Sequence, residues 1–70
     1  MEIRETFAKN LRRLRQSKGL SQEELAHRAD LDRTYISSLE RSIYSPSIDV
    51  VDRLSTVLGV EAADLLKKSK

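Results

Sequence analysis

A short polar stretch in the middle of the chain has the residue types that read nucleic-acid bases. Arg33 and Thr34 are followed by Ser37 and Ser38, and this spacing places the four side chains on one side of a helix. Arginine can donate two parallel hydrogen bonds to guanine, and serine or threonine can use a hydroxyl or, for threonine, a methyl group against thymine. The stretch therefore predicts a helix face that hydrogen-bonds to base edges.

Two short helices joined by a tight turn would hold this face in place. Ser21 and Glu24 form a predicted capping box, in which the serine hydroxyl accepts the Glu24 amide and the Glu24 carboxylate accepts the Ser21 amide. The helix that begins there buries Leu25, Ala26 and Ala29, and its alanines let a second helix cross closely. This is the spacing of a helix-turn-helix, which inserts a helix into the DNA major groove.

The second helix of the motif is predicted to begin at Arg33, with Asp32 capping it through its carboxylate. Ile36 and Leu39 are three residues apart and face the core, so the polar side faces outward. For Tyr35 two interpretations stay open. It is either a core aromatic with its hydroxyl at the rim, or a contact to a phosphate of the DNA backbone or to a thymine.

The remaining apolar periodicity predicts three further helices and no strand. The first runs from Ile3 to Ser17, with Gly19 as its C-terminal cap. Another follows Pro46 with Ser47 as its N-cap, and a short last helix covers about 61–67. The fold class is therefore all-α. The expected inward side chains are Phe7, Leu11 and Leu14 in the first helix, Ile48, Val51, Leu54 and Leu58 in the fourth, and Ala62, Leu65 and Leu66 in the last.

Composition argues against catalysis and against bound metals or cofactors. The chain has 70 residues, a formal net charge of +2, a single histidine and no cysteine. Disulfides and thiolate metal sites are thereby excluded, and no glycine-rich phosphate loop or acid-base pair is recognisable. No segment reads as a signal peptide or membrane span. We expect a cytoplasmic protein of a bacterium or phage, associated with the nucleoid.

Several segments agree at once with one known family. The strings LRRLRQSKGLSQEELA, LDRTYISSLER and SPSIDVVDRL resemble the lambda-repressor-like, Cro/C1 (XRE-type) DNA-binding domain, from about Phe7 to Leu66. LDRTYIS is most similar to controller proteins of restriction-modification systems and to related small repressors. The resemblance implies one domain over residues 1–70, with five helices and the helix-turn-helix at the second and third.

The resemblance also implies roles for individual side chains. Gln22 would touch a phosphate and support the base-reading residues, and Arg41 would meet the DNA backbone. Arg15 and Glu40 would form an internal ion pair that ties the first helix to the end of the third. The positions that read bases in relatives correspond to Arg33, Thr34 and Ser38 here, with Ser37 as a fourth.

The chain departs from the family pattern on both sides of the third helix. Asp30 stands where the family has a glycine in a left-handed turn, a conformation that Asp tolerates better than most residues. Ser42 stands where many members have glycine, and Ile43 and Tyr44 follow where relatives tend to be polar. We expect the turn to be kept and the loop along the DNA backbone to differ.

These features together predict a sequence-specific transcriptional regulator that binds double-stranded DNA. One such domain reads few base pairs, so we expect a homodimer on a palindromic operator, with helix 33–41 of each copy in successive major grooves about 34 Å apart. An apolar strip formed by Val50 and Val57, extended by Ala62 and Leu66, is our hypothesis for the dimer interface.

Two alternatives concern the partner. Activation of transcription would require a surface that contacts RNA polymerase, and no residue marks one. A protein of this fold could also be a protein-interaction module, either an antitoxin-like partner or an adaptor that no longer reads DNA. The combination of Gln22, Arg33, Thr34 and Ser38 favours the DNA-binding interpretation, because an adaptor has no need of all four.

Overall fold

The computed structural model describes residues 2–68 and confirms the all-α, five-helix fold. Between these residues the chain contains no strand. No helix in this part of the chain combines the length and the apolar character needed to cross a membrane. The last helix is shorter than the 61–67 that the sequence predicts. The helices are α1 (Ile3–Ser17), α2 (Gln22–Ala29), α3 (Arg33–Glu40), α4 (Ile48–Leu58) and α5 (Ala62–Leu66).

Side-chain caps start two helices as the sequence predicts, but not the third. Ser21 Oγ accepts the Glu24 N–H at 3.0 Å, and the Glu24 carboxylate accepts the Ser21 N–H at 2.8 Å. Ser47 Oγ likewise accepts the Val50 N–H at 3.1 Å. Asp32 has the extended backbone of an N-cap but makes no side-chain capping bond. The prediction that its carboxylate caps α3 is therefore wrong, because solvation of this exposed group competes with the bond.

Four helices end in the same way, with one residue in the left-handed region. These residues are Gly19, Asp30, Ser42 and Gly59, with φ of 72°, 58°, 61° and 71°. In each case the amide of the next residue donates to the carbonyl five positions earlier, at 2.8 to 3.1 Å, as in a Schellman motif. The prediction that Asp30 keeps the turn is confirmed. Asp30 and Ser42, which flank α3, adopt it at a cost of about 1 kcal/mol each relative to glycine.

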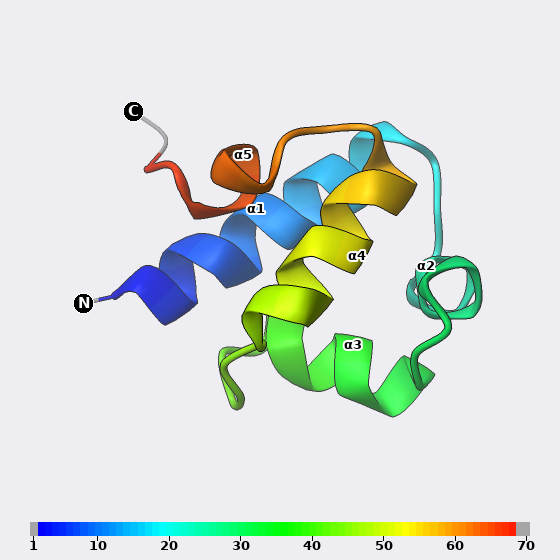
Figure 1. Cartoon of the computed structure of the whole chain (residues 1–70). Coiled ribbons are helices and arrows are strands. Elements are labelled where there is room, and N and C mark those ends of the chain that lie inside the picture. The colour runs from blue at the N-terminus through cyan, green and yellow to red at the C-terminus, as the bar shows by residue number, and fades with distance from the viewer. Residues whose placement is uncertain (1, 69–70) are drawn as a thin grey trace.

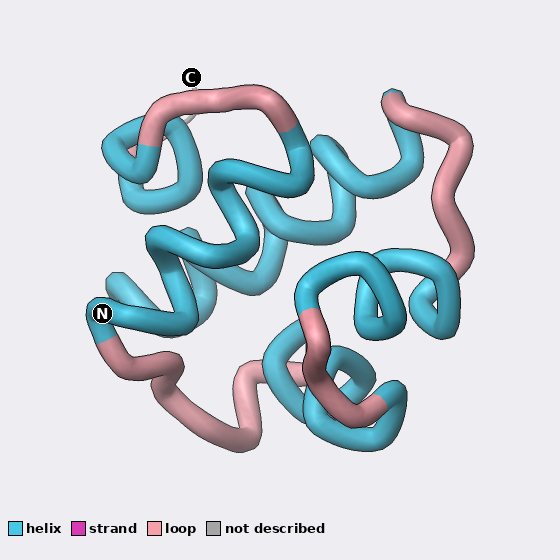
Figure 2. Tube along the Cα trace, turned by 45° about the vertical axis from the view of Figure 1, so that its right-hand side comes forward, coloured by secondary structure: helices cyan, strands magenta, loops and turns pink. Residues whose placement is uncertain are grey.

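α3 and α5 lie at opposite edges of the molecule, with α4 between them (Figure 1). A tube view turned by 45° keeps this order and shows the long connection from α3 to α4 passing around the outside (Figure 2). α3 packs on α1 and α2, while α5 packs on α1 and α4. The large side chains that close the core are Phe7, Leu11, Leu25, Ile36, Leu39, Leu54, Leu58 and Leu65.

The first residue of α4 is an exception to the predicted core. Ile48 is 85% exposed, so the prediction that it faces inward with Val51 and Leu54 is wrong. Helical side chains point back toward the helix N-terminus, so a side chain in the first turn overhangs the end of its helix. Leu66 at the end of α5 is also exposed, whereas Leu65 beside it is fully buried.

A buried amide fastens the end of α5 to α1. Asn10 is 2% exposed, and its Nδ2 donates to the carbonyls of Leu65 at 2.9 Å and Lys67 at 2.8 Å. Its Oδ1 accepts from Arg13 Nη2 at 3.1 Å. Every polar atom of this buried side chain therefore has a partner, and α5 is held at the end where a helix of five residues leaves its carbonyls unsatisfied.

Candidate nucleic-acid interface

The outward strip of α3 is narrower than the sequence predicts. Arg33 and Thr34 are exposed, and Ser37 is half-buried. Ser38, by contrast, is only 6% exposed, so the prediction that it projects outward with the others is wrong. α3 packs against both α1 and α2, and a side chain as short as serine beside the strip is covered by its surroundings. The surface available to a ligand consists of Arg33, Thr34 and Ser37.

The C-terminal end of α3 is fixed by a buried carboxylate. The Glu40 side chain is fully buried and accepts from Arg15 Nε at 2.6 Å and Arg15 Nη2 at 3.0 Å. Its Oε1 also accepts from Gln22 Nε2 at 3.1 Å and Arg12 Nε at 3.4 Å. Arg15 Nη1 further donates to the Leu20 carbonyl at 2.8 Å. Glu40 thus joins α3 to α1 and to the first residue of α2.

The electrostatics of this cluster keep Glu40 ionised. Burial alone would raise the pKa of its carboxyl group, but hydrogen bonds from Arg15 and Gln22 outweigh burial and hold this pKa below its usual range. The hydrogen bonds that Arg15 donates to Glu40 in turn raise the pKa of Arg15. A buried charge with four donors is satisfied, whereas loss of one partner would leave an uncompensated charge in the interior.

The hydrogen bond to Glu40 also fixes how Gln22 is turned. An ionised carboxylate can only accept, so the amide nitrogen of Gln22 must be the atom that faces it. The amide oxygen of this half-buried side chain then points away from Glu40. Gln22 stands at the start of α2, beside the end of α3, and its orientation is set before any ligand arrives.

The other two residues predicted to meet a DNA backbone lie on different sides of α3. Tyr35 is half-buried and packs against the core, which agrees with the core interpretation of the two that the sequence leaves open. Arg41 is exposed at the C-terminal end of the helix. Arg41 follows Ser37 of the outward strip by one helical turn, whereas Tyr35 packs on the core.

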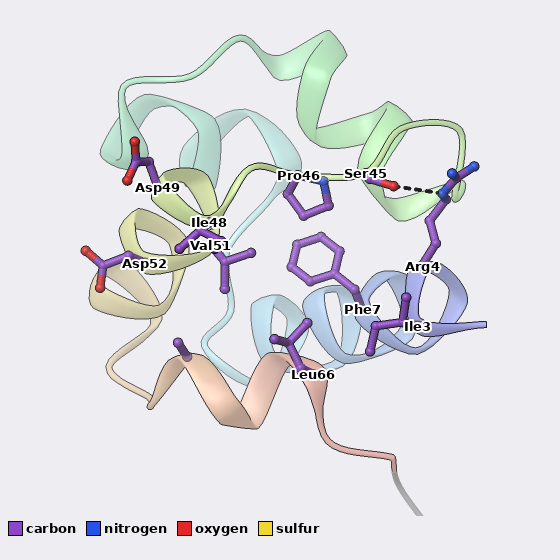
Figure 3. A pocket seen from close by; sticks show the side chains of 11 residues that line it. Ile3, Arg4, Phe7, Ser45, Pro46, Ile48, Asp49, Val51, Asp52 and Leu66 are labelled. Atoms are coloured by element: carbon purple, nitrogen blue, oxygen red, sulfur yellow. Dashed lines mark hydrogen bonds between the residues drawn. The ribbon is translucent and has the colours of Figure 1, made fainter. Parts of the chain in front are cut away.

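The four residues of the hypothesised dimer strip fall into two pairs. Val50 and Val57 are half-buried and pack against the core. Ala62 and Leu66 line a groove together with Ile3 and Ile48, and neither valine lines it (Figure 3). Both valines lie nearer the core than the sequence predicts, and α4 packs against both α2 and α5.

Two residues of these networks were missed at the sequence level. Arg12 lies one turn before Arg15 on α1 and also donates to Glu40. Its spacing of three residues from Arg15 places both side chains on one helix face, and this pattern could have identified Arg12 from the sequence. Asn10 lies three residues after Phe7 and next to Leu11, on an otherwise apolar face. A lone polar residue at an inward position indicates a buried hydrogen-bonding role.

Residues 11–65 match the profile of the helix-turn-helix family HTH_3. The chain belongs to this family. Its members are DNA-binding transcription regulators and not enzymes, and the resemblance to Cro/C1-type domains and to controller proteins is confirmed. The matched segment contains α2 and α3 with the Glu40 cluster at their junction.

Individual HTH_3 proteins agree with this assignment over most of the chain. A hypothetical transcription factor of Neisseria meningitidis is 42% identical over 65 residues, which are 93% of this chain but 61% of that protein. The restriction-modification controller protein C.AhdI of Aeromonas hydrophila is 40% identical with a TM-score of 0.86, covering 89% of this chain and 94% of that one. The biofilm regulator SinR, solved in complex with DNA, is 35% identical with a TM-score of 0.84, covering 87% and 98%.

Proposed function

We propose that this HTH_3 protein is a sequence-specific regulator that binds a palindromic operator as a homodimer, with α3 in the major groove. The observation that carries the proposal is the exposure of Arg33 and Thr34 on a helix whose far end is locked by Glu40. A guanidinium and two hydroxyls, including that of Ser37, provide donors and acceptors for base edges. The similarity to SinR, which was solved with DNA, supports this use of the surface.

Contacts to the DNA backbone would position this reading face. We assign them to Gln22 at the start of α2, to Arg41 at the end of α3 and to the rim of Tyr35. Phosphate contacts fix orientation without reading sequence, so these three residues would contribute to affinity on any duplex. Ser38 is buried in the free protein. It remains a candidate base contact only if a base edge reaches it at the border of the outward strip.

The first test is selection of bound duplexes from a random library at physiological salt. We expect enrichment of a palindrome whose half-sites are centred one helical turn apart, about 34 Å. If nothing is enriched and residual binding disappears with added salt, the operator proposal fails. The antitoxin-like or adaptor alternative would then take its place. A transcription assay with RNA polymerase on the selected site separates repression from activation. We propose that the protein acts on the nucleoid of a bacterium or on phage DNA there.

The second test is the substitution Arg33→Ala on the selected site. Loss of a bidentate guanine contact should cost roughly 1 to 3 kcal/mol in binding and relax the preference at one base pair of each half-site. Arg53→Ala removes the same charge from the exposed side of α4 and should leave base preference unchanged. Equal losses on the selected and scrambled duplexes would show that Arg33 contacts only a phosphate.

A further inference from the structure

A small basic pocket lies where α1 passes the C-terminal end of α3, and it holds about 240 Å³. Its lining residues are Glu5, Ala8, Lys9, Arg12, Glu40, Arg41 and Ser42. Arg41 follows Ser37 of the outward strip by one helical turn, so the pocket continues from the end of that strip. Most of the lining residues nevertheless belong to α1, outside the helix-turn-helix.

Positive charge is in excess in the basic pocket. Arg15 already neutralises Glu40 through two hydrogen bonds, of 2.6 and 3.0 Å. The three cations of the pocket therefore face a single uncompensated carboxylate, that of Glu5. Neither Lys9 nor Arg41 forms an ion pair within residues 2–68. A concave site with surplus positive charge raises the local concentration of anions.

The guanidinium of Arg12 is held in the basic pocket by the fold itself. Its Nε donates to Glu40 Oε1 at 3.4 Å, while its two terminal nitrogens make no hydrogen bond within the described part of the chain. The side chain is 53% exposed, so a ligand can reach these nitrogens. A guanidinium can donate two parallel hydrogen bonds to a phosphate. Arg12 therefore has the properties of a phosphate ligand.

Ser42 adopts a backbone conformation that serine disfavours. Its φ of 61° lies in the left-handed region, which glycine occupies without strain. Its hydroxyl makes no hydrogen bond among residues 2–68, so the side chain gives no compensating bond within the fold. The loop beyond it is tied to α1, because Arg4 Nε donates to Ser45 Oγ at 3.0 Å (Figure 3). Strained residues cluster at binding sites, and serine adds to this pocket a donor that glycine lacks.

We infer that the basic pocket binds a phosphate of the DNA backbone. Lys9 supplies charge, Arg12 supplies two donors and Ser42 supplies a hydroxyl. The inference rests on the proposed function and deepens it, because it adds a contact from α1 to those assigned to Gln22 and Arg41. Each strand of a duplex carries a phosphate about every 3.4 Å along the helix axis. A strand that meets Arg41 therefore has further phosphates to offer the adjoining pocket.

Substitutions of Ser42 separate DNA binding from stability. Ser42→Gly relieves the left-handed backbone, so the fold should be at least as stable in denaturant as wild type. Loss of the hydroxyl should nevertheless weaken binding about threefold, equally on the selected and the scrambled duplex. Ser42→Ala keeps the strain and should lose the same affinity. Unchanged affinity in both variants would remove Ser42 from the site.

The charges of the pocket are tested by the salt dependence of binding to the scrambled duplex. Lys9→Ala removes a side chain without a partner among the described residues, and binding should weaken roughly tenfold. The slope of log affinity against log salt concentration should fall by about one for each chain bound. Glu5→Gln should strengthen binding. Lys18→Ala is the matched control, because the Lys18 ammonium lies beside Gly59 at the end of α4, and its slope should match wild type.

Ethylation of single phosphates in the selected duplex locates the contact. One phosphate should weaken binding of the wild-type protein when it is ethylated and have no effect on Lys9→Ala, while the others affect both proteins alike. Equal changes of slope for Lys9→Ala and Lys18→Ala would overturn the inference, since net charge alone would explain them. An unchanged slope for Lys9→Ala would overturn it too. If the wild-type protein selects no sequence, the operator proposal fails, whereas the slopes on the scrambled duplex still decide whether the pocket binds a phosphate.

Discussion

The two ends of α3 are built in opposite ways. Its C-terminal end carries the fully buried Glu40 carboxylate, which accepts four hydrogen bonds from two other helices. Its N-terminal end begins at Asp32, whose side chain makes no capping bond, and continues with exposed Arg33 and Thr34. The position of the C-terminal end is fixed by contacts with other helices, whereas the N-terminal end faces solvent.

The difference separates stability from recognition along a helix of eight residues. Substitutions at the buried end should destabilise the domain strongly, because they leave buried charges without partners. Substitutions at the exposed end can change the DNA contacts at little cost to the fold, since surface positions tolerate exchange. Under the proposed function, changes at Arg33, Thr34 or Ser37 alone should be sufficient to change the preferred operator.

Removal of the buried carboxylate should have the largest effect. Glu40→Ala leaves Arg15, whose side chain is only 11% exposed, facing an emptied site, and we expect a loss of about 3 to 5 kcal/mol in unfolding free energy. Chemical denaturation measures this value. Glu23→Ala removes the same charge from an exposed position on α2 and should cost far less. Similar losses of unfolding free energy for both variants would show that buried Glu40 stabilises the fold no more than an exposed glutamate.

Acid should weaken the same end of the helix. The pKa of Glu40 is lower in the folded protein than in the unfolded chain, where it is about 4.3. The stabilisation is therefore complete above the unfolded value and is lost as the pH falls through the folded one. Thermal unfolding should show a steeper loss below about pH 4 for wild type than for Glu40→Gln. Parallel curves would contradict the role of Glu40.

The smallest effect should come from the uncapped start of α3. Asp32→Ala removes no hydrogen bond within the fold, so we expect a loss of only a few tenths of a kcal/mol in unfolding free energy. Ser21→Ala breaks a bond of 3.0 Å to the Glu24 amide and should cost about 1 kcal/mol. If the two losses were equal, the two helix starts would not differ in the way described.

The features that the sequence predicts best are those that depend on neighbouring residues along the chain. The capping box at Ser21, the cap at Ser47 and the left-handed Asp30 follow from residue types a few positions apart. The helix-turn-helix follows from the small residues Ala26 and Ala29, which are both buried. Local rules of hydrogen bonding and steric fit are sufficient for these predictions.

The features that the sequence predicts poorly depend on how the helices pack. Ser38 is covered because α3 is flanked by two helices, and Ile48 is exposed because it overhangs the first turn of α4. A helical wheel describes one helix at a time, so it predicts neither the burial of Ser38 nor the exposure of Ile48. The three residues that donate to Glu40 lie 18 to 28 positions away along the chain, and only the assembled fold brings them together.

The hydrogen bonds of Asn10 have a consequence for the speed at which the proposed homodimer would assemble. A helix of five residues is too short to persist alone, yet α5 is tied to α1 by two bonds at its end. Leu66, which lies between the two tethered carbonyls, is thereby held in place on the groove wall. In the proposed homodimer, two chains that meet would only have to find the right orientation, because α5 is already folded in each. Their association rate constant should therefore fall at about 10⁵ to 10⁷ M⁻¹s⁻¹, the range for preformed protein surfaces.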